Sequence, residues 1–324
     1  MYAARLLAAG GVIAIPTETV YGLAADMTNA AAVRRIYAIK GRPLDHPLIV
    51  HLPSAASIER YAADVPASAH RLMERFWPGP LTIVLHKSDA VPPSVTGGQQ
   101  TVALRTIDHP LARAILLRFG SAVAAPSANR FGRVSPTTAE HVHADLGDDV
   151  DLIVDGGPAR IGVESTIVDL TGDVPTILRQ GAIGASALAD VLGTPVAAHS
   201  GGNVRAPGML AAHYAPQAAL VVAEDGALAS TAAQLRASGG HVAELTLPED
   251  PRAAARSLYA SLRALDGQGF DTIVVALPSD IEANAAVRDR LLRAATPALT
   301  SAEAFRSLPR AAAPSRRSRM PRDP

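Results

Sequence analysis

The sequence predicts an α/β protein in which a twisted mixed sheet with flanking helices is followed by a small Rossmann-like parallel α/β domain. Three observations favour this fold class. Short apolar runs of strand length alternate with helical patterns in the first two thirds of the chain, but not strictly, which is typical of a mixed sheet. Residues 194–216 are rich in Gly, Pro, Ser and Asn and keep no periodicity. Strand and helix patterns then alternate cleanly, as in a parallel α/β unit.

In the first unit, strands are expected at short apolar runs bounded by turn residues, and helices at apolar residues spaced three and four apart. Asn29 and Thr137 are expected N-caps, because their side-chain oxygens can accept a hydrogen bond from a free amide of the first helical turn. The expected strands are Gly11–Ile15, Pro47–Leu52, Leu81–Leu85, Thr101–Leu104, Ala122–Ala125, Leu152–Val154, Thr166–Leu170 and Thr176–Leu178. The expected helices are Ala30–Ile39, Ala67–Phe76, Pro110–Phe119, Thr138–Leu146 and Ala185–Leu192.

The chain divides into four expected segments. A mixed-sheet domain (1–193) is followed by a linker (194–216), a smaller α/β domain (217–307) and a basic tail (308–324) that we expect to be disordered. A loop as long as this linker often serves as a lid over a functional site. The expected strands and helices of the smaller domain are, in alternation, Ala219–Val222, Ala227–Ala237, His241–Leu245, Arg252–Leu265, Thr272–Leu277 and Ala283–Ala294.

The composition excludes several classes of site and partner. The 324 residues include 30 Lys+Arg and 30 Asp+Glu, and this balance argues against a protein that holds nucleic acid by bulk electrostatics. The sequence contains no cysteine, which excludes disulfides, zinc–thiolate sites and cysteine nucleophiles. The N-terminus lacks a signal-peptide pattern and no apolar stretch is long enough to span a bilayer, so we expect a cytoplasmic protein without a membrane partner.

Lysine is rare in this arginine-rich chain, and one of the lysines begins a Lys-Gly-Arg-Pro segment. Lys40 and Lys87 are the only lysines among 30 Lys+Arg residues. Lys40 lies two residues before Arg42, and this pairs a compact point charge with a planar guanidinium that is not interchangeable with it. Such a pair suits a polyphosphate, which Lys approaches as a point charge and Arg binds bidentately. Because the chain has neither a P-loop nor a G-x-G-x-x-G motif, it would bind a nucleotide by another scheme.

Further polar residues gather near the ends of expected strands, where open sheets bind ligands. Two hydroxyls, a carboxylate and a phenol follow the first strand within Pro16–Leu23. Thr101 and Arg105 lie four residues apart on one strand and therefore point to the same face. Ser127 and Asn129 follow another strand, and their side chains can donate to phosphate or sugar oxygens. These residues predict a ligand site at one end of the sheet.

Four segments occur together in an order that is typical of one enzyme family: PTETVYGL, KGRPLDHPLIVHL, APSANRFGRVSP and ESTIVDL. With these segments the chain resembles the threonylcarbamoyl-AMP synthase family, whose members carry a YrdC-like domain. The resemblance covers Leu6 to Leu192. The linker sequence APGMLAAHYAP and the smaller α/β unit resemble the longer, two-domain branch of that family. The resemblance therefore implies a YrdC-like catalytic domain and a linker that closes over its active site.

The family's reaction joins L-threonine, bicarbonate and ATP into threonylcarbamoyl adenylate and releases pyrophosphate, with Mg²⁺ as the expected cofactor. The resemblance implies a nucleotidyltransferase in which a carbamate of threonine attacks the α-phosphorus in line. A separate tRNA threonylcarbamoyl transferase complex uses the product. The near-zero net charge suits this division of labour, and we expect no stable tRNA binding.

The resemblance also implies a role for each matched residue, although it names no metal ligand. Lys40, Arg42, Ser127 and Asn129 match the family's K-x-R and S-x-N signatures and are the implied catalytic residues. The residues implied to hold ATP are Lys40, Arg42, His46, Thr101, Ser127, Asn129, Ser135, Arg179, His213 and Tyr214. The residues implied to surround threonine are Thr19, His51, Ala125, Ser165 and Arg105, the last of which would pair with its carboxylate.

Three alternatives stay open at this point. A carbamoyl-transferring relative used in hydrogenase maturation carries a similar domain, but it also carries cysteine-rich zinc motifs that this cysteine-free chain lacks. The chain could instead be a non-catalytic protein that binds double-stranded RNA, which would require many phosphate contacts and a strong salt dependence. It could also be a paralogue that binds nucleotide without turnover. Pyrophosphate release that depends on ATP, threonine and bicarbonate discriminates the enzyme from these binding proteins.

Overall fold

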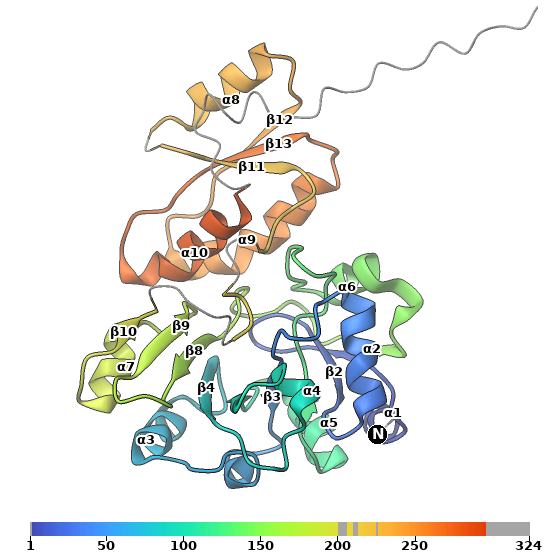
Figure 1. Cartoon of the computed structure of the whole chain (residues 1–324). Helices are drawn as coiled ribbons and strands as arrows, with labels where there is room; N and C mark the ends of the chain where they lie inside the picture. The colour runs from blue at the N-terminus through green and yellow to red at the C-terminus, as the bar shows by residue number, and fades with distance from the viewer. Residues whose placement is uncertain (1, 200–205, 210–212, 225, 296–324) are drawn as a thin grey trace, which may run out of the picture.

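The computed structural model describes residues 2–199, 206–209, 213–224 and 226–295 of the chain. Its larger domain is built on a ten-stranded mixed sheet with the strand order β10-β9-β8-β4-β5-β3-β6-β2-β1-β7 (Figure 1). The strands are β1 (Ile13–Ile15), β2 (Gly22–Asp26), β3 (Ile49–His51), β4 (Leu81–His86), β5 (Thr101–Arg105), β6 (Val123–Ala124), β7 (Leu152–Ile153), β8 (Thr166–Asp169), β9 (Thr176–Arg179) and β10 (Ala197–Ala198).

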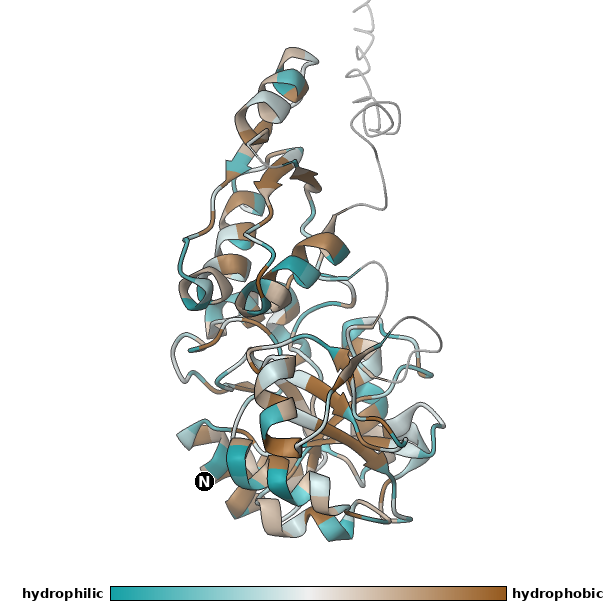
Figure 2. Ribbon diagram, turned by 90° about the vertical axis from the view of Figure 1, so that its left-hand side faces the viewer, coloured by the Kyte–Doolittle hydropathy of each residue, from teal (hydrophilic) through white to brown (hydrophobic). Residues whose placement is uncertain are grey.

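Helices pack on both faces of the large sheet. On one face α1 and α5 bury apolar residues of β1, β2 and β6, whereas α2, α3, α6 and α7 cover the opposite face and enclose the main core. Figure 2 shows the apolar residues, in brown, along the strands between these layers. The helices are α1 (Tyr2–Ala8), α2 (Ala30–Lys40), α3 (Ala67–Phe76), α4 (Pro93–Thr96), α5 (Pro110–Phe119), α6 (Ala139–Leu146) and α7 (Ala185–Leu192).

The linker covers the part of the first face that lies beyond α1 and α5. There Ala206 and Met209 pack on apolar residues of β3, β4, β5, β8 and β9. Because side chains alternate along a strand, His51 of β3 and Arg105 of β5 point to the same face as Ile49 and Ala103. The apolar strand residues under the linker are Ile49, Val84, Ala103, Ile167 and Leu178.

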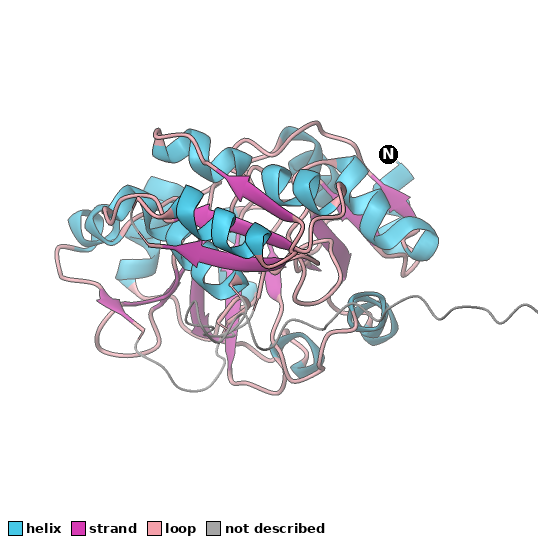
Figure 3. Ribbon diagram, turned by 90° about the horizontal axis from the view of Figure 1, so that it is seen from above, coloured by secondary structure: helices cyan, strands magenta, loops and turns pink. Residues whose placement is uncertain are grey.

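The smaller domain is a three-stranded parallel sheet that lies over the larger domain (Figures 1 and 3). Its strand order is β11-β13-β12, with α8 packed on one face and α9 and α10 on the face turned toward the larger domain. The elements of this domain are β11 (Ala219–Ala223), α8 (Leu228–Ala237), β12 (Val242–Leu245), α9 (Pro251–Asp266), β13 (Thr272–Ala276) and α10 (Ala285–Ala294).

Within the described residues of both domains, no helix has both the length and the apolar character needed to cross a bilayer.

The two domains share an apolar cluster and a forked ion pair. Val20, Val134 and Val163 of the larger domain belong to the same buried cluster as the apolar residues of α9 and α10. Arg263 of α9 donates from Nη1 and Nη2 to the two carboxylate oxygens of Asp145, at 2.9 and 2.5 Å. This fork fixes the orientation of α9 as well as its distance from α6, because a bidentate pair is geometrically specific.

The structure confirms the fold class and every strand and helix expected from the sequence, within a few residues, and it adds elements that the sequence reading missed. Helix α1 and strand β2 were not expected, and the linker contains the short strand β10. The predicted cap Thr137 is wrong, because the neighbouring Thr138 accepts from the amide of His141. The basic tail (308–324) lies outside the described residues, and the boundaries of the four segments stay predictions.

Replacing the cap of α2 should weaken the fold measurably. The side chain of Asn29 accepts from the amides of Ala31 and Ala32, so Asn29→Ala leaves these donors without a protein partner. We expect a loss of about 1 kcal/mol in the free energy of unfolding, measured by urea titration and circular dichroism. Asn29→Asp keeps an acceptor and should lose much less; an equal loss in both variants would contradict the assignment.

Candidate active site

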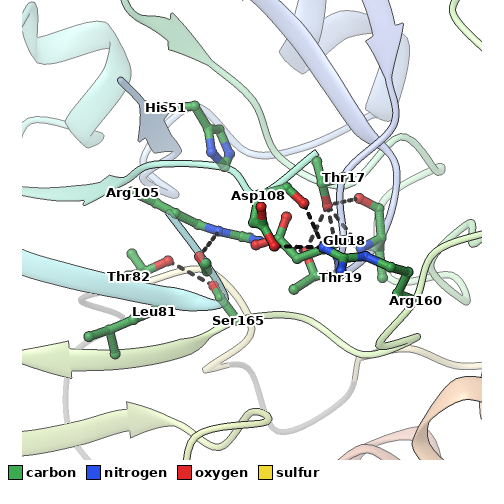
Figure 4. A network of polar contacts seen from close by, with 12 residues as sticks. Thr17, Glu18, Thr19, His51, Leu81, Thr82, Arg105, Asp108, Arg160 and Ser165 are labelled. Atoms are coloured by element: carbon green, nitrogen blue, oxygen red, sulfur yellow. Dashed lines mark hydrogen bonds and ion pairs between the residues drawn. The ribbon is translucent and has the colours of Figure 1, made fainter. Parts of the chain in front are cut away.

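Four adjacent strands place a row of polar side chains at one end of the large sheet. β3 and β5 are parallel and end at His51 and Arg105, which are direct neighbours in the ladder. β4 is antiparallel to β5 and parallel to β8, so these two strands begin at that same end, beside Thr82 and Ser165. The four side chains lie close together across the strands in Figure 4. The register of the sheet therefore brings these four side chains together, and they form the floor of the candidate site.

Arg105 is held by the turn that follows β1. Its Nη2 donates to Glu18 Oε1 at 2.7 Å and to Thr19 Oγ1 at 3.0 Å (Figure 4). Its Nε donates to the Gly79 carbonyl. Thr17 closes the turn by donating from Oγ1 to the Val20 carbonyl. Nη1 of Arg105 has no hydrogen-bond partner among the described residues. The guanidinium is thus fixed and neutralised by Glu18 while one of its nitrogens stays available.

Arg179, at the end of β9, is held only by neutral oxygens. Its Nε donates to the Ser165 carbonyl, its Nη2 to Ser165 Oγ and its Nη1 to the Pro207 carbonyl of the linker. Ser165 Oγ also bonds to Thr82 Oγ1 at 2.7 Å. The described residues contain no carboxylate in direct contact with Arg179, so no ion pair within the described structure occupies its guanidinium.

Lys40 holds the loop that carries the expected S-x-N signature. Nζ donates to the carbonyls of Ser127 and Asn129, each at 2.6 Å, and the residue is buried. Burial and the neighbouring Arg42 lower the pKa of Lys40 well below its ordinary value. The Asn129 amide in turn donates to the carbonyls of Arg130 and Arg133. Lys40 and Asn129 therefore shape this loop with contacts that are already made within the protein.

Arg42 reaches the site because helix α2 stops at Lys40. Gly41 follows with a φ of 64°, in the left-handed conformation that favours glycine, and so redirects the chain. The Arg42 guanidinium donates to the Pro47 carbonyl and lies 5.6 Å from the centre of the Phe131 ring. Burial lowers the pKa of Arg42 to about 10, so it stays a cation at neutral pH.

The linker closes the site with His213 and Tyr214. Their rings contact each other at 4.1 Å between centroids, and His213 also packs edge-on against Phe131. Tyr214 has a φ of 65°, which is unique among the non-glycine residues of the described ranges and is a strained conformation for tyrosine. Gly208 permits this arrangement, since a Cβ there would come within 2.3 Å of the Tyr214 hydroxyl.

These segments enclose a cavity lined by polar atoms that have no protein partner. Arg42 Nε, His51 Nδ1, His213 Nδ1 and the Tyr214 hydroxyl are all buried without a hydrogen bond in the described structure. Buried polar groups are normally satisfied, so such a cluster marks a ligand site. The described lining residues are Thr17, Thr19, Val20, Tyr21, Gly22, Arg42, Ile49, His51, Arg105, Ala125, Pro126, Ser127, Glu164, Arg179, Pro207, Gly208, His213 and Tyr214.

Several residues expected from the sequence lie around this cavity rather than on its wall. Ser165 and Asn129 act through the contacts described above, whereas the His46 ring lies tilted against the Phe131 ring. Thr101 lies at the opposite end of β5 from Arg105 and is half-buried. Ser135 donates to Glu164 Oε1 at 2.5 Å. Of the fifteen expected residues, those not among the described lining residues are Lys40, His46, Thr101, Asn129, Ser135 and Ser165.

Sequence reasoning missed Glu164 and its partner Arg290. Glu164 provides the sole carboxylate among the described lining residues, and Arg290 of α10 donates to it from Nε at 2.8 Å. Burial by itself raises the pKa of Glu164, but Arg290 and Arg179 outweigh burial and hold this pKa at about 2. The sequence did contain one indication that Arg290 is buried. It lies beside Leu291 and three residues after Val287, and this spacing places it on the buried face of α10.

Comparisons with known proteins identify the family. A family model described as "Telomere recombination" matches residues 5–181, and one described as "Threonylcarbamoyl-AMP synthase, C-terminal domain" matches residues 183–296. The threonylcarbamoyl-AMP synthase of Bacillus subtilis (strain 168) is 40% identical to this chain over 318 residues, which cover 90% of this chain and 92% of the relative. The chain belongs to the threonylcarbamoyl-AMP synthase family.

Two comparisons with proteins of Pyrococcus abyssi agree with this assignment. The threonylcarbamoyl-AMP synthase of Pyrococcus abyssi is 38% identical, with 90% of this chain and 92% of the relative covered. The crystal structure of P. abyssi Sua5 complexed with L-threonine matches the whole architecture with a TM-score of 0.87 at 37% identity, and 94% of each chain is covered. The family resemblance and the two-part α/β fold predicted from the sequence are therefore confirmed.

The buried histidines of the cavity should make stability depend on pH. Burial lowers the pKa of His51 and of His213 to about 3, against an ordinary value of 6.5. Below pH 6.5 the unfolded chain therefore binds protons that the folded protein does not, and stability falls as the pH is lowered. The contribution of each histidine to this slope should approach about 1.4 kcal/mol per pH unit as the pH falls well below 6.5.

Urea titrations between pH 7 and 5 measure this slope. The variant His213→Gln should have a shallower slope than the unmodified protein, because the unfolded chain then has one fewer histidine that binds a proton only when unfolded. Identical slopes for the two proteins would show that His213 titrates normally in the fold.

Proposed function

We propose that this chain is an L-threonylcarbamoyladenylate synthase, a nucleotidyltransferase that converts L-threonine, bicarbonate and ATP to threonylcarbamoyl-AMP and pyrophosphate. Its product would serve tRNA threonylcarbamoyladenosine modification in the cytoplasm, through a separate transferase complex. The observation that carries the proposal is the cavity wall, where Arg42 and Arg179 have neutral protein partners only. Two uncompensated arginines suit a triphosphate. Family membership supplies the amino acid and the reaction.

The chemistry balances without a covalent enzyme intermediate. The threonine amine attacks the carbon of bicarbonate, and loss of water gives a carbamate. A carbamate oxygen then attacks the α-phosphorus of ATP while the bond to the β-phosphate oxygen breaks and pyrophosphate leaves. The protein's task is to position these groups and to neutralise charge that develops on the phosphates. Arg42 and Arg179 are the groups that we assign to this neutralisation.

His51 is suited to the amino acid. Its Nε2 lies 3.2 Å from the Ala125 carbonyl, which can only accept, so this nitrogen carries the proton. Nδ1 is then an acceptor without a partner in the described residues, and it can receive a hydrogen bond from the amine or hydroxyl of threonine. Thr19 and Arg105 line the same cavity, where Arg105 can meet the threonine carboxylate. Ser165 would act on the substrates indirectly, because its hydroxyl accepts a hydrogen bond from Arg179 and so holds that side chain in place.

Lys40, Ser127 and Asn129 would act on ATP through the loop that they form. The Nζ of Lys40 already contacts two carbonyls, so we assign it to fixing the loop beside the phosphates. His213 and Tyr214 would close over the nucleotide from the linker. A carbamate loses CO₂ readily in water, and a closed linker excludes the water that would destroy it.

Magnesium would enter with ATP rather than on a site of the protein. Among the described residues there is no group of three His, Cys, Asp or Glu side chains placed to hold a metal ion. Glu164 has both oxygens engaged by Ser135, Tyr259 and Arg290. The phosphates of ATP can supply the oxygen ligands that Mg²⁺ prefers. We therefore treat Mg–ATP as the substrate.

Pyrophosphate release tests the proposed function directly. The purified protein, incubated with Mg–ATP, L-threonine and bicarbonate, should release pyrophosphate only when all three are present. A binding protein for double-stranded RNA would release none, and a paralogue without turnover would bind ATP but release none. Absence of pyrophosphate under these conditions would overturn the assignment.

The two arginines without carboxylate partners should be needed for the reaction. Arg42→Ala and Arg179→Ala each remove a preorganised positive group, and we expect kcat/KM for ATP to fall by about 10²–10³. The affinity for threonine, measured by calorimetry without ATP, should change far less. Arg113→Ala, on the exposed side of α5, is the matched control and should retain activity. Near-normal kcat/KM in both site variants would refute these roles.

A further inference from the structure

Glu164 is an unexpected residue for a cavity that is proposed to hold a triphosphate. A carboxylate repels phosphate unless its charge is neutralised, and it also competes for nearby arginines. Here both oxygens are engaged: Oε1 accepts from Ser135, and Oε2 accepts from the Tyr259 hydroxyl at 2.9 Å and from Arg290 Nε at 2.8 Å. Tyr259 and Arg290 both belong to the smaller domain.

Arg290 touches three parts of the site although it is completely buried. Besides Glu164, its Nη2 donates to the Gln180 carbonyl, directly after Arg179. Its guanidinium carbon lies 4.8 Å from the centre of the Tyr214 ring, a cation–π contact with the linker. One side chain of α10 therefore joins the cavity carboxylate, the backbone beside Arg179 and the linker.

Among the described residues, Glu164 is paired with Arg290 and not with Arg179. Arg179 is close enough to lower the pKa of Glu164, yet the structure shows no ion pair between them in the described residues. Arg290 occupies Glu164 instead, and Arg179 keeps only neutral acceptors. Without Arg290, the buried negative charge of Glu164 would face the cavity and attract Arg179 away from a phosphate.

We propose that Arg290 is a positioning residue for ATP: it neutralises Glu164 so that Arg179 remains free for the phosphates, and the smaller domain thereby completes the nucleotide site. This inference rests on the proposed function. It goes beyond anchoring of the linker, because it gives the smaller domain an electrostatic part in substrate binding. A merely structural Arg290 would affect ATP and threonine alike, whereas this role affects ATP and acts through Glu164.

A double-mutant cycle separates these roles. Arg290→Met, Glu164→Gln and the double variant are compared by calorimetric binding of Mg–ATP and, separately, of L-threonine. We expect Arg290→Met to weaken ATP binding by about tenfold or more and threonine binding by less than about threefold. In the Glu164→Gln background the same substitution should change ATP binding by less than about threefold, since the cavity carboxylate has lost its charge and Asp289, the other carboxylate paired with Arg290, keeps its ion pair with Arg293.

Two further variants complete the design. Arg288→Met removes an arginine of the same helix that pairs with Asp280 instead, and its ATP affinity should match that of the unmodified protein. If Arg290→Met does not fold, as judged by circular dichroism, Arg290→Gln replaces it with the same expectations, because glutamine keeps donors without the charge. Glu164→Gln and the double variant can be compared even if Arg290→Met alone does not fold, because neither of these two proteins buries the Glu164 charge.

The outcomes are distinct. Equal losses of ATP and threonine affinity, or a double variant that binds ATP about tenfold more weakly than Glu164→Gln alone, would overturn the role of Arg290 while leaving the proposed function intact. An unmodified protein that binds no ATP and releases no pyrophosphate would overturn both. Selective loss of ATP affinity that disappears in the Glu164→Gln background supports the inference.

Discussion

Burial of charge at one end of the large sheet is the constraint on which the rest of this structure depends. A charged group removed from water must be paired or hydrogen-bonded, or the fold loses several kcal/mol. Arg105 is paired with Glu18, Glu164 is paired with Arg290, and the amine of Lys40 is surrounded by carbonyls. Arg42 and Arg179 differ, because their described contacts are with neutral atoms only. The site is thus built to be completed by an anion.

This arrangement needs both domains and the linker. The register of β3, β5, β4 and β8 fixes the floor, and the loop held by Lys40 forms one wall. The linker supplies the cover, with Tyr214 in a strained backbone conformation that is supported by the cation–π contact from α10. Strain of this kind persists only where the surroundings enforce it. The smaller domain therefore helps to hold Tyr214 in its place over the cavity.

The sequence predicted the secondary structure well because most elements carry a clear period and clear boundaries. Strand β2 was missed because Gly22–Asp26 contains no β-branched or aromatic residue, so burial and not propensity makes it a strand. Asn29 was recognised as a cap because capping depends on neighbours in the sequence. Thr137 was misassigned by one position, since either threonine could cap and only the packing of α6 decides between them.

The site residues were harder to predict because their partners are distant in the sequence. The family resemblance pointed to half of the described residues that line the cavity, including His51, Arg105 and Arg179. No spacing rule could show that Lys40 meets carbonyls 87 and 89 positions away, or that Glu164 meets an arginine 126 positions away in another domain. Such contacts follow from the topology of the chain. A sequence motif shows which residue type is present at a position, but it does not show which distant residue that side chain contacts.

The central claim is that the uncompensated arginines receive the triphosphate while the cavity carboxylate stays neutralised from the other domain. A crystal structure with a non-hydrolysable ATP analogue, Mg²⁺ and L-threonine tests this most directly. We expect phosphate oxygens within hydrogen-bond distance of Arg42 and Arg179, with Glu164 still bound to Arg290. A triphosphate bound away from both arginines, or an Arg179 that has turned to pair with Glu164, would contradict the account.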